Sequence, residues 1–467
     1  MKCIILTIAY NAEKTIERAI KSILAQTYTD WMFYIVDNGS DDATYEISRR
    51  YAETNKNIIV LREEKNDIWA VVKYIKQVLS EQGDAYAMCT LDADDAYAQD
   101  FLKTAVYAME TNGVDMVVLG TKFLDADTGK VIGGNIVQRD IVVSKQNIDQ
   151  YFASIHWYLR QMWCKLYRVD VFRRYEIVAM KQLVYGGDTA LVLQFLEHAD
   201  KFAIISQCGY FYYVSRKSAS YVFREGRFLS DQILYETTVH FLQEKAGYVG
   251  EQNKEFMLLV YYHAMMDTLK VTIQAEAPMK LKLNEVYQSL HHKITRELLA
   301  SNHVFIGDNE WKESLRREIV GWIFKDIHVY SEEDIVVAWN LLVELNKEFS
   351  KIVPLQNLHW LMVNGCDIVQ MVAVAQYKNA FDELWMRLEN NRMPCHSCIF
   401  ALGQALAAYL SFENEYILFS KMLIQSYFEE GHIDHACQEL LDLLLILPND
   451  KDLLEMKQTY MLTEQSQ

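Results

Sequence analysis

The chain has 467 residues, of which 51% are hydrophobic and 12% aromatic. This length and composition exclude a disordered chain and predict a folded protein with two or three domains. The formal net charge of -17 argues against a protein built to bind nucleic acid.

The cysteines and the N-terminal residues indicate where the protein works. Eight cysteines are scattered without a disulfide framework, and Cys3, Cys89 and Cys164 lie in apolar surroundings, which is typical of a reducing compartment. The N-terminal apolar run turns polar at Asn11, too early for a signal peptide, and no later run reaches the length of a membrane span. We therefore expect a cytoplasmic protein, and peripheral contact with the inner face of the membrane stays open.

Strand and helix patterns alternate over the first hundred residues. Apolar runs predict strands over residues 4–9, 32–36, 58–61 and 85–91, and helical spacing predicts helices over 13–26, 42–52 and 68–80. Such alternation predicts a largely parallel sheet with helices on both faces, an α/β Rossmann-like domain. In these sheets ligands bind beyond the carboxyl ends of the strands.

An acidic stretch follows the fourth predicted strand. Asp92, Asp94 and Asp95 fall within four positions, and Asp37 ends the second predicted strand. Carboxylates so close together repel one another unless a cation shares them, and Mg²⁺ takes carboxylates together with phosphate oxygens. The two strand ends can converge on one crevice. The stretch is consistent with a metal-diphosphate site, and locally also with a solvated acidic turn.

The pattern changes after Gly113. A strand over 114–119 is followed by hairpin arms over 121–124 and 130–132, so the second Asp-x-Asp pair, Asp125 and Asp127, is interpreted as part of a turn. Residues 148–174 are predicted to be helical. Asp188 is placed to cap a helix over 189–198, and residues 202–206 and 210–214 read as two strands.

Strand signals end near residue 221 and long amphipathic helices follow. We expect domains at 1–220, 221–350 and 351–467, the last with helical repeats. A tetratricopeptide-like pattern is formed by Tyr427, Gly431, Ala436, Leu440, Leu441 and Pro448. Stacked repeats of this kind bind proteins or peptides, or serve packing and homo-oligomer formation.

Five segments together carry a family resemblance. They are LTIAYNAEKTIERAIKSILAQTY, YIVDNGSDDAT, LDADD, WCKLYRVDVF and YGGDTALVLQFL, in this order. The N-terminal 220 residues resemble the family 2 glycosyltransferases of GT-A fold, which are inverting enzymes that use nucleotide sugars, most often UDP-linked. The resemblance implies a nucleotide-sugar donor, a glycan or protein acceptor, and a divalent cation, Mn²⁺ or Mg²⁺.

The resemblance also assigns roles to single residues. It implies that Ala9, Tyr10 and Asn11 begin the nucleotide-binding loop, that Asp37 binds the base, that Asp92 faces the ribose, that Asp94 is the metal ligand and that Asp188 is the catalytic base. The residue before this base is usually glutamate in the family, whereas here it is Gly187.

Other residues are candidates on chemical grounds. Arg216 and Lys217 form a basic loop that could close over the diphosphate, or be simply exposed. Trp163, in the segment that resembles the acceptor side, could stack on a sugar ring or pack in the core.

Three functions follow from these assignments. The leading hypothesis is a metal-dependent inverting transferase acting on a cell-surface glycan, a lipid-linked glycan or a protein. A more specific hypothesis is protein glycosylation, of an adhesin or flagellin for example, with the helical region holding the acceptor. The alternative of another class is a non-catalytic scaffold with a degenerate transferase domain.

Overall fold

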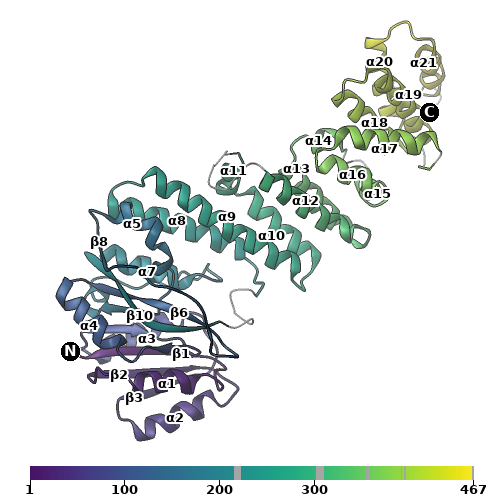
Figure 1. Ribbon diagram of the computed structural model, residues 1–467. Helices are drawn as coiled ribbons and strands as arrows, with labels where there is room; N and C mark the ends of the chain where they lie inside the picture. The colour runs from purple at the N-terminus through teal and green to yellow at the C-terminus, as the bar shows by residue number, and fades with distance from the viewer. Residues whose placement is uncertain are drawn as a thin grey trace. The chain divides into compact units, whose positions relative to one another are not determined.

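The computed structural model describes residues 1–214, 222–300, 310–353, 355, 357–390, 392–393 and 396–464. Its contacts divide the chain into two compact units, Met1–Val271 and Thr272–Gln467. The first unit holds all the described strands, and the second consists of helices (Figure 1).

The described strands of the first unit form one ten-stranded sheet in the order β3-β2-β1-β4-β9-β6-β10-β5. Its parallel half is formed by β3 (Ile58–Glu63), β2 (Trp31–Asn38), β1 (Cys3–Ala9) and β4 (Ala87–Thr90). The other half contains β9 (Lys165–Arg168), β6 (Met116–Asp125), β10 (Lys201–Val214) and β5 (Ala96–Tyr97). At the margins β7 (Val131–Asn135) pairs with β6, and β8 (Ile141–Ser144) pairs with β10.

Both faces of the sheet are buried. Successive residues of β1 point to opposite faces, and the residues on each face belong to a separate hydrophobic core. Cys3 and Ile5 belong to one core, together with α1 (Ile16–Leu24) and α4 (Phe101–Asn112). Ile4 and Leu6 belong to the other, with α3 (Ala70–Glu81), α5 (Ile148–Ile155) and α7 (Gly187–His198). The predicted α/β architecture, a mostly parallel sheet between helices, is confirmed.

The remaining elements of this unit flank the sheet. They are α2 (Thr44–Thr54), the 3₁₀ helix η1 (His156–Leu159), α6 (Val169–Phe172), α8 (Arg227–Ala246) and α9 (Glu251–Gln274). Helix α8 packs against α5 and α7. The first compact unit therefore includes α8 and most of α9 together with the sheet, although the last strand ends at Val214. The domain boundaries at 220 and 350 stay predictions.

Three predicted elements differ from the structure. Residues 148–174 are not all helical, because β9 inserts antiparallel between β4 and β6. The two strands expected over 202–206 and 210–214 are one strand, β10, with register shifts between Ile205 and Tyr210. Asp188 does not cap its helix, because α7 begins at Gly187 after Gly186, whose φ is 77°.

The second unit is a succession of helices. They are α10 (Met279–His291), α11 (Lys293–Ala300), α12 (Glu310–Lys325), η4 (Ile327–Val329), α13 (Glu332–Leu345), α14 (Phe349–Ile352), α15 (Leu358–Asn364), α16 (Cys366–Ala373), α17 (Tyr377–Glu389), α18 (Ser397–Tyr409), α19 (Glu413–Glu429), α20 (Ile433–Ile446) and α21 (Lys451–Glu464). Neighbours in sequence pack together, as α18 does with α19 and α19 with α20.

The proposed repeat pattern falls on α19 and α20. Tyr427 and Ala436 are buried at 7% and 0% exposure, and Gly431 adopts a φ of 82° between the two helices. Leu441 is 40% exposed, so it is not a core position. The helical pair is confirmed, and its assignment to tetratricopeptide repeats stays a prediction.

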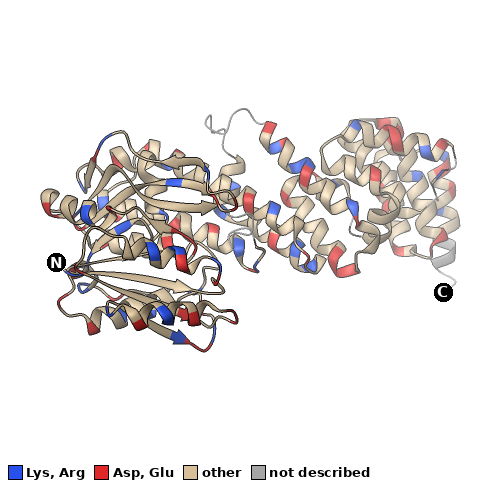
Figure 2. Ribbon diagram, turned by 60° about the horizontal axis from the view of Figure 1, so that its bottom comes forward, with Lys and Arg blue, Asp and Glu red and all other residues tan. Residues whose placement is uncertain are grey.

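Lys and Arg are interspersed with Asp and Glu along the helices and loops of both units (Figure 2). Cys3, Cys89 and Cys164 are buried, as their apolar neighbours indicated, and burial raises the pKa of the Cys3 thiol to about 12. No helix among the described residues is both long and apolar enough to cross a membrane.

Candidate active site

Three strand ends meet at one edge of the sheet. Strand β1 lies between β2 and β4 and runs parallel to both, so the loops after Ala9, after Asn38 and after Thr90 leave the sheet side by side. The hydroxyl of Thr7 donates to the Leu91 carbonyl oxygen at 2.7 Å, which ties the end of β1 to the acidic stretch. The three strand ends therefore lie together at the carboxyl edge of the sheet, as the parallel arrangement predicted.

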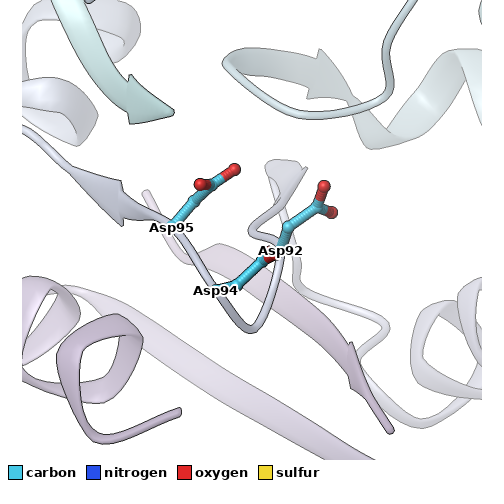
Figure 3. A group of neighbouring side chains, drawn as sticks. All are labelled: Asp92, Asp94 and Asp95. Carbon is cyan, nitrogen blue, oxygen red and sulfur yellow. The ribbon is translucent and has the colours of Figure 1, made fainter. Parts of the chain in front are cut away.

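The acidic loop after β4 brings three carboxylates together. Ligand oxygens of Asp92, Asp94 and Asp95 lie within 4.8 Å of one another, and no other such group of His, Cys, Asp and Glu occurs among the described residues. Figure 3 shows the three side chains on one tight loop, with Asp92 and Asp95 extending to the same side of it. Asp95 is fully buried, whereas Asp92 and Asp94 are accessible.

Asp95 anchors this loop to β10. Its carboxylate accepts hydrogen bonds from the Tyr210 hydroxyl and from the Tyr213 backbone N–H, both at 2.8 Å. The same Tyr210 hydroxyl accepts the Asp92 N–H at 3.3 Å. The Arg18 guanidinium donates to the Asp94 carbonyl oxygen and lies 3.5 Å from the centre of the Tyr213 ring. Asp95, which has no predicted role, thus fixes the shape of the loop.

The carboxylates raise one another's pKa. Desolvation, and then the charges of Asp95, Asp188 and Asp94, raise the pKa of Asp92 well above its usual value. Desolvation and the neighbouring Asp94 raise the pKa of Asp95 to about 8. Such a cluster holds protons until a cation compensates its charge. Because Asp188 contributes to the shift of Asp92, the acidic loop and Asp188 share one electrostatic environment.

Asp188 lies in the first turn of α7. Its carboxylate accepts the Met162 N–H at 3.3 Å, from the loop that precedes β9. Desolvation raises its pKa, whereas the Met162 hydrogen bond and the Lys165 charge lower it. A carboxyl group with a raised pKa, beside an acidic metal-type loop, suits general-base chemistry.

Lys165 supports the loop that holds Asp188. Its side chain is 1% exposed, and its ammonium group donates to the carbonyl oxygens of Gln161 and Trp163, which flank Met162. Desolvation lowers the pKa of Lys165 to about 8, against the opposing effects of Cys164 and Asp188. The sequence shows the lysine but not its hydrogen bonds, because the turn before β9 brings the two carbonyl oxygens to its ammonium group.

The predicted nucleotide loop lies beside the end of β2. Ala9 is buried and pairs with Asp37, whereas Tyr10 is 46% exposed. Asn11, with a φ of 49°, donates its N–H to the Ser40 hydroxyl at 3.0 Å, and its amide oxygen accepts the Asp41 N–H. These contacts place Tyr10 and Asn11 at the same edge as the acidic loop. Their contact with a nucleotide stays a prediction.

Asp37 is buried at 0% exposure and forms an ion pair with Arg62, its neighbour on β3, at 3.1 Å. Arg62 also lies 4.5 Å from the centre of the Tyr45 ring. The base-binding role of Asp37 stays a prediction, and Arg62, which sequence reasoning missed, is now its partner.

Trp163 is 6% exposed and stacks on Tyr210 at 4.4 Å and on Tyr212 at 5.5 Å between ring centres. These contacts are those of a core residue, so the predicted acceptor contact gains no support from them. Arg216 and Lys217 lie outside the described residues. Asp125 is a turn former as predicted, because its carboxylate accepts the Thr128 N–H and hydroxyl.

Comparison with known proteins agrees with this arrangement. Residues 4–175 match the family described as Glycosyl transferase family 2. This match and the relatives named as glycosyltransferases identify the chain as a glycosyltransferase. The matched segment holds β1 to β4, the acidic loop and the loop at Met162, and it ends before Asp188.

Two relatives from Bacillus subtilis illustrate the similarity. EpsH, named as a glycosyltransferase, is 25% identical over 268 residues, which cover 56% of this chain and 74% of EpsH. TuaG, named as a teichuronic acid biosynthesis glycosyltransferase, is 34% identical over 99 residues, which cover 21% of this chain and 38% of TuaG. Among solved structures, S. aureus TarS 1–349 in complex with UDP-GlcNAc is 16% identical, with a TM-score of 0.41 over 79% of this chain and 90% of that chain.

Proposed function

We propose that the enzyme transfers a sugar from a nucleotide-sugar donor, most often UDP-linked, to an acceptor hydroxyl, with a divalent cation at the acidic loop and with inversion at the anomeric carbon. The observation that carries this proposal is the cluster of Asp92, Asp94 and Asp95, whose ligand oxygens lie within 4.8 Å of one another at the sheet edge it shares with Asp37. Asp188 lies close enough to raise the pKa of Asp92.

The residues of the acidic loop fit a divalent cation. Carboxylate oxygens are the ligands that Mg²⁺ and similar hard cations prefer, and Mg²⁺ keeps free positions for phosphate oxygens. Asp94 is accessible and would hold the cation, Mn²⁺ or Mg²⁺, and Asp92 would face the ribose. When bound, the cation would neutralise the charge that develops on the leaving diphosphate.

Asp188 would act as the base. Its carboxylate would accept the proton of the acceptor hydroxyl as this attacks the anomeric carbon, an effect worth roughly 10²–10⁴-fold in rate. The Met162 N–H holds the carboxylate in place. A single base and a single displacement give inversion, so an α-linked donor would give a β-linked product.

The acceptor is part of the proposal. A cell-surface glycan, a lipid-linked glycan or a protein presents the required hydroxyl, and the name of TuaG, teichuronic acid biosynthesis, supports a cell-surface glycan. Such an enzyme would work in the cytoplasm, with peripheral membrane contact for a lipid-linked acceptor. Homo-oligomer formation would use the helical unit.

Replacement of one acid tests the metal assignment. Asp94→Ala should abolish Mn²⁺-stimulated turnover of a UDP-sugar, and chelation of the wild-type enzyme should have the same effect. Asp127→Ala is the matched control, because Asp127 has the same spacing from its neighbour but lies on the exposed β6–β7 turn. Turnover that is retained both after chelation and in Asp94→Ala would contradict the assignment of a metal to this loop.

A further inference from the structure

A cavity of about 150 Å³ lies beside Asp188. Its walls come from the start of α3, from the segment around Tyr185, from the first turns of α7 and from Arg224. No residue of the acidic loop lines it. The cavity is therefore adjacent to the proposed base but separate from the proposed metal-diphosphate position.

Trp69 occupies space that Gly187 leaves free. A Cβ atom at position 187 would lie 2.9 Å from Cη2 and 3.3 Å from Cζ3 of the Trp69 indole. The first distance is closer than carbon atoms pack, so any side chain at 187 would displace the indole. Glycine at 187 thus lets an aromatic ring form a wall of the cavity directly next to Asp188.

Polar groups accompany this apolar wall. The Trp69 indole N–H is buried and has no hydrogen-bond acceptor among the residues that the structure describes. The Asp188 carboxylate is an acceptor, and the exposed Arg224 guanidinium, which donates to the Val184 carbonyl oxygen at 3.1 Å, is a donor at the cavity. An occupant of matching chemistry has a flat apolar face and hydroxyl groups around its rim.

We propose that Trp69 is a specificity-determining residue, on whose indole face a pyranose ring packs beside Asp188. The C–H face of a pyranose suits an aromatic surface, and its hydroxyls suit the Asp188 carboxylate and the Arg224 guanidinium at the cavity. The inference rests on the proposed function, since it concerns the sugar that reacts at that site. The donor carries such a ring, and so does a glycan acceptor.

The Trp69→Ala variant tests the inference by calorimetry, with UDP and a panel of UDP-glucose, UDP-galactose and UDP-GlcNAc as probes. If the ring belongs to the donor, affinity for the preferred UDP-sugar falls about tenfold while affinity for UDP stays unchanged. If the ring belongs to the acceptor, the affinities for UDP and for the UDP-sugar both stay unchanged. The variant then no longer binds methyl glycosides when it is loaded with UDP, as measured by saturation-transfer NMR.

Two further variants distinguish loss of the aromatic contact with the sugar from a general loss of folded structure. Trp69→Phe keeps an aromatic face and should retain most of the affinity. Gly187→Ala should reproduce the Trp69→Ala effect, because the new methyl group displaces the indole. Gly83→Ala is the control, because a Cβ there meets nothing within 4 Å.

The outcomes distinguish this inference from the function on which it rests. Failure of the wild-type enzyme to bind UDP would overturn both. UDP binding together with unchanged UDP-sugar and glycoside binding in Trp69→Ala would overturn the role of Trp69 alone. An equal loss of UDP and UDP-sugar affinity would show a structural effect and would also overturn it.

Discussion

The hydroxyl of Tyr210 donates to the carboxylate of Asp95 at 2.8 Å and is buried with it. Because the same hydroxyl accepts the Asp92 N–H, a residue of β10 holds both ends of the acidic loop. A loop with three carboxylates needs such a scaffold, since its own charges favour its opening. The contact links the sheet to the shape of the proposed metal site.

Removal of this hydroxyl should weaken cation binding. Tyr210→Phe keeps the ring in its stack on Trp163 but loses the hydrogen bond to Asp95. Outer-shell partners of metal ligands are worth about 10–100-fold in metal affinity, so we expect a loss in that range for Mn²⁺, measured by calorimetry. Tyr74→Phe is the control, because its hydroxyl contacts Glu63, outside the acidic loop. Unchanged Mn²⁺ affinity in Tyr210→Phe would contradict the scaffold role.

Cation affinity should rise with pH. The pKa of Asp95 is raised to about 8, desolvation and the neighbouring acids raise the pKa of Asp92 well above its usual value, and a cation among these carboxylates favours their deprotonated forms. Mn²⁺ titrations between about pH 6 and about pH 9 should therefore show tighter binding and less proton release as pH increases. Affinity that is independent of pH would count against protonated carboxylates in the free site.

The same groups set a pH dependence of stability in the metal-free protein. The folded pKa of Asp95 exceeds its ordinary value of 3.8, so the folded state binds more protons than the unfolded state. Its contribution to stability is complete below the unfolded pKa and is lost as pH rises through about 8. Thermal unfolding should thus occur at lower temperature in metal-free protein as pH rises through this window, and Asp95→Asn should flatten the trend.

Asp188→Asn should separate chemistry from binding. The amide keeps the size of the carboxylate but cannot take the proton of the acceptor, so transfer should fall by about 10²–10⁴-fold while UDP affinity is retained. The pH profile of wild-type transfer should drop on the acid side at a pH above the ordinary carboxyl range, because desolvation raises the pKa of Asp188. Full activity in Asp188→Asn would assign the base elsewhere.

Close packing of α18 and α19 gives a prediction for the helical unit. A Cβ on Gly403 would lie 2.2 Å from the Phe419 ring, so Gly403→Ala should destabilise by about 1–3 kcal/mol. Gly321→Ala, inside α12 with nothing within 4 Å, should instead stabilise by about 0.4–1 kcal/mol. Calorimetric unfolding of both variants tests this, and equal effects would show that the helices do not pack as described.

Features that depend on neighbouring residues in the chain could be predicted from the sequence. Four strands in alternation with helices predict a parallel sheet, and a parallel sheet places the ends of β1, β2 and β4 at one edge. The turn role of Asp125 also followed from its neighbours Thr128 and Gly129.

Relationships over long sequence separation were not accessible. Tyr210 and Asp95 are 115 residues apart, and nothing in the local pattern of β10 identifies the hydroxyl that pairs with the carboxylate. Strand β9 has only four residues, three of them buried, which are too few to show a period of two, and only its pairing with β4 and β6 makes it a strand. Gly187 departs from the family pattern, but the Trp69 ring that packs against it comes from the residue just before α3, more than a hundred positions earlier in the chain.

Release of UDP from a panel of UDP-sugars, with and without Mn²⁺, tests the central claim most directly. We predict turnover of at least one UDP-sugar that requires Mn²⁺ or Mg²⁺, disappears on chelation and is absent in Asp94→Ala. Equal UDP release by the metal-stripped enzyme and by Asp94→Ala, or no UDP-sugar turnover under any metal condition, would contradict it.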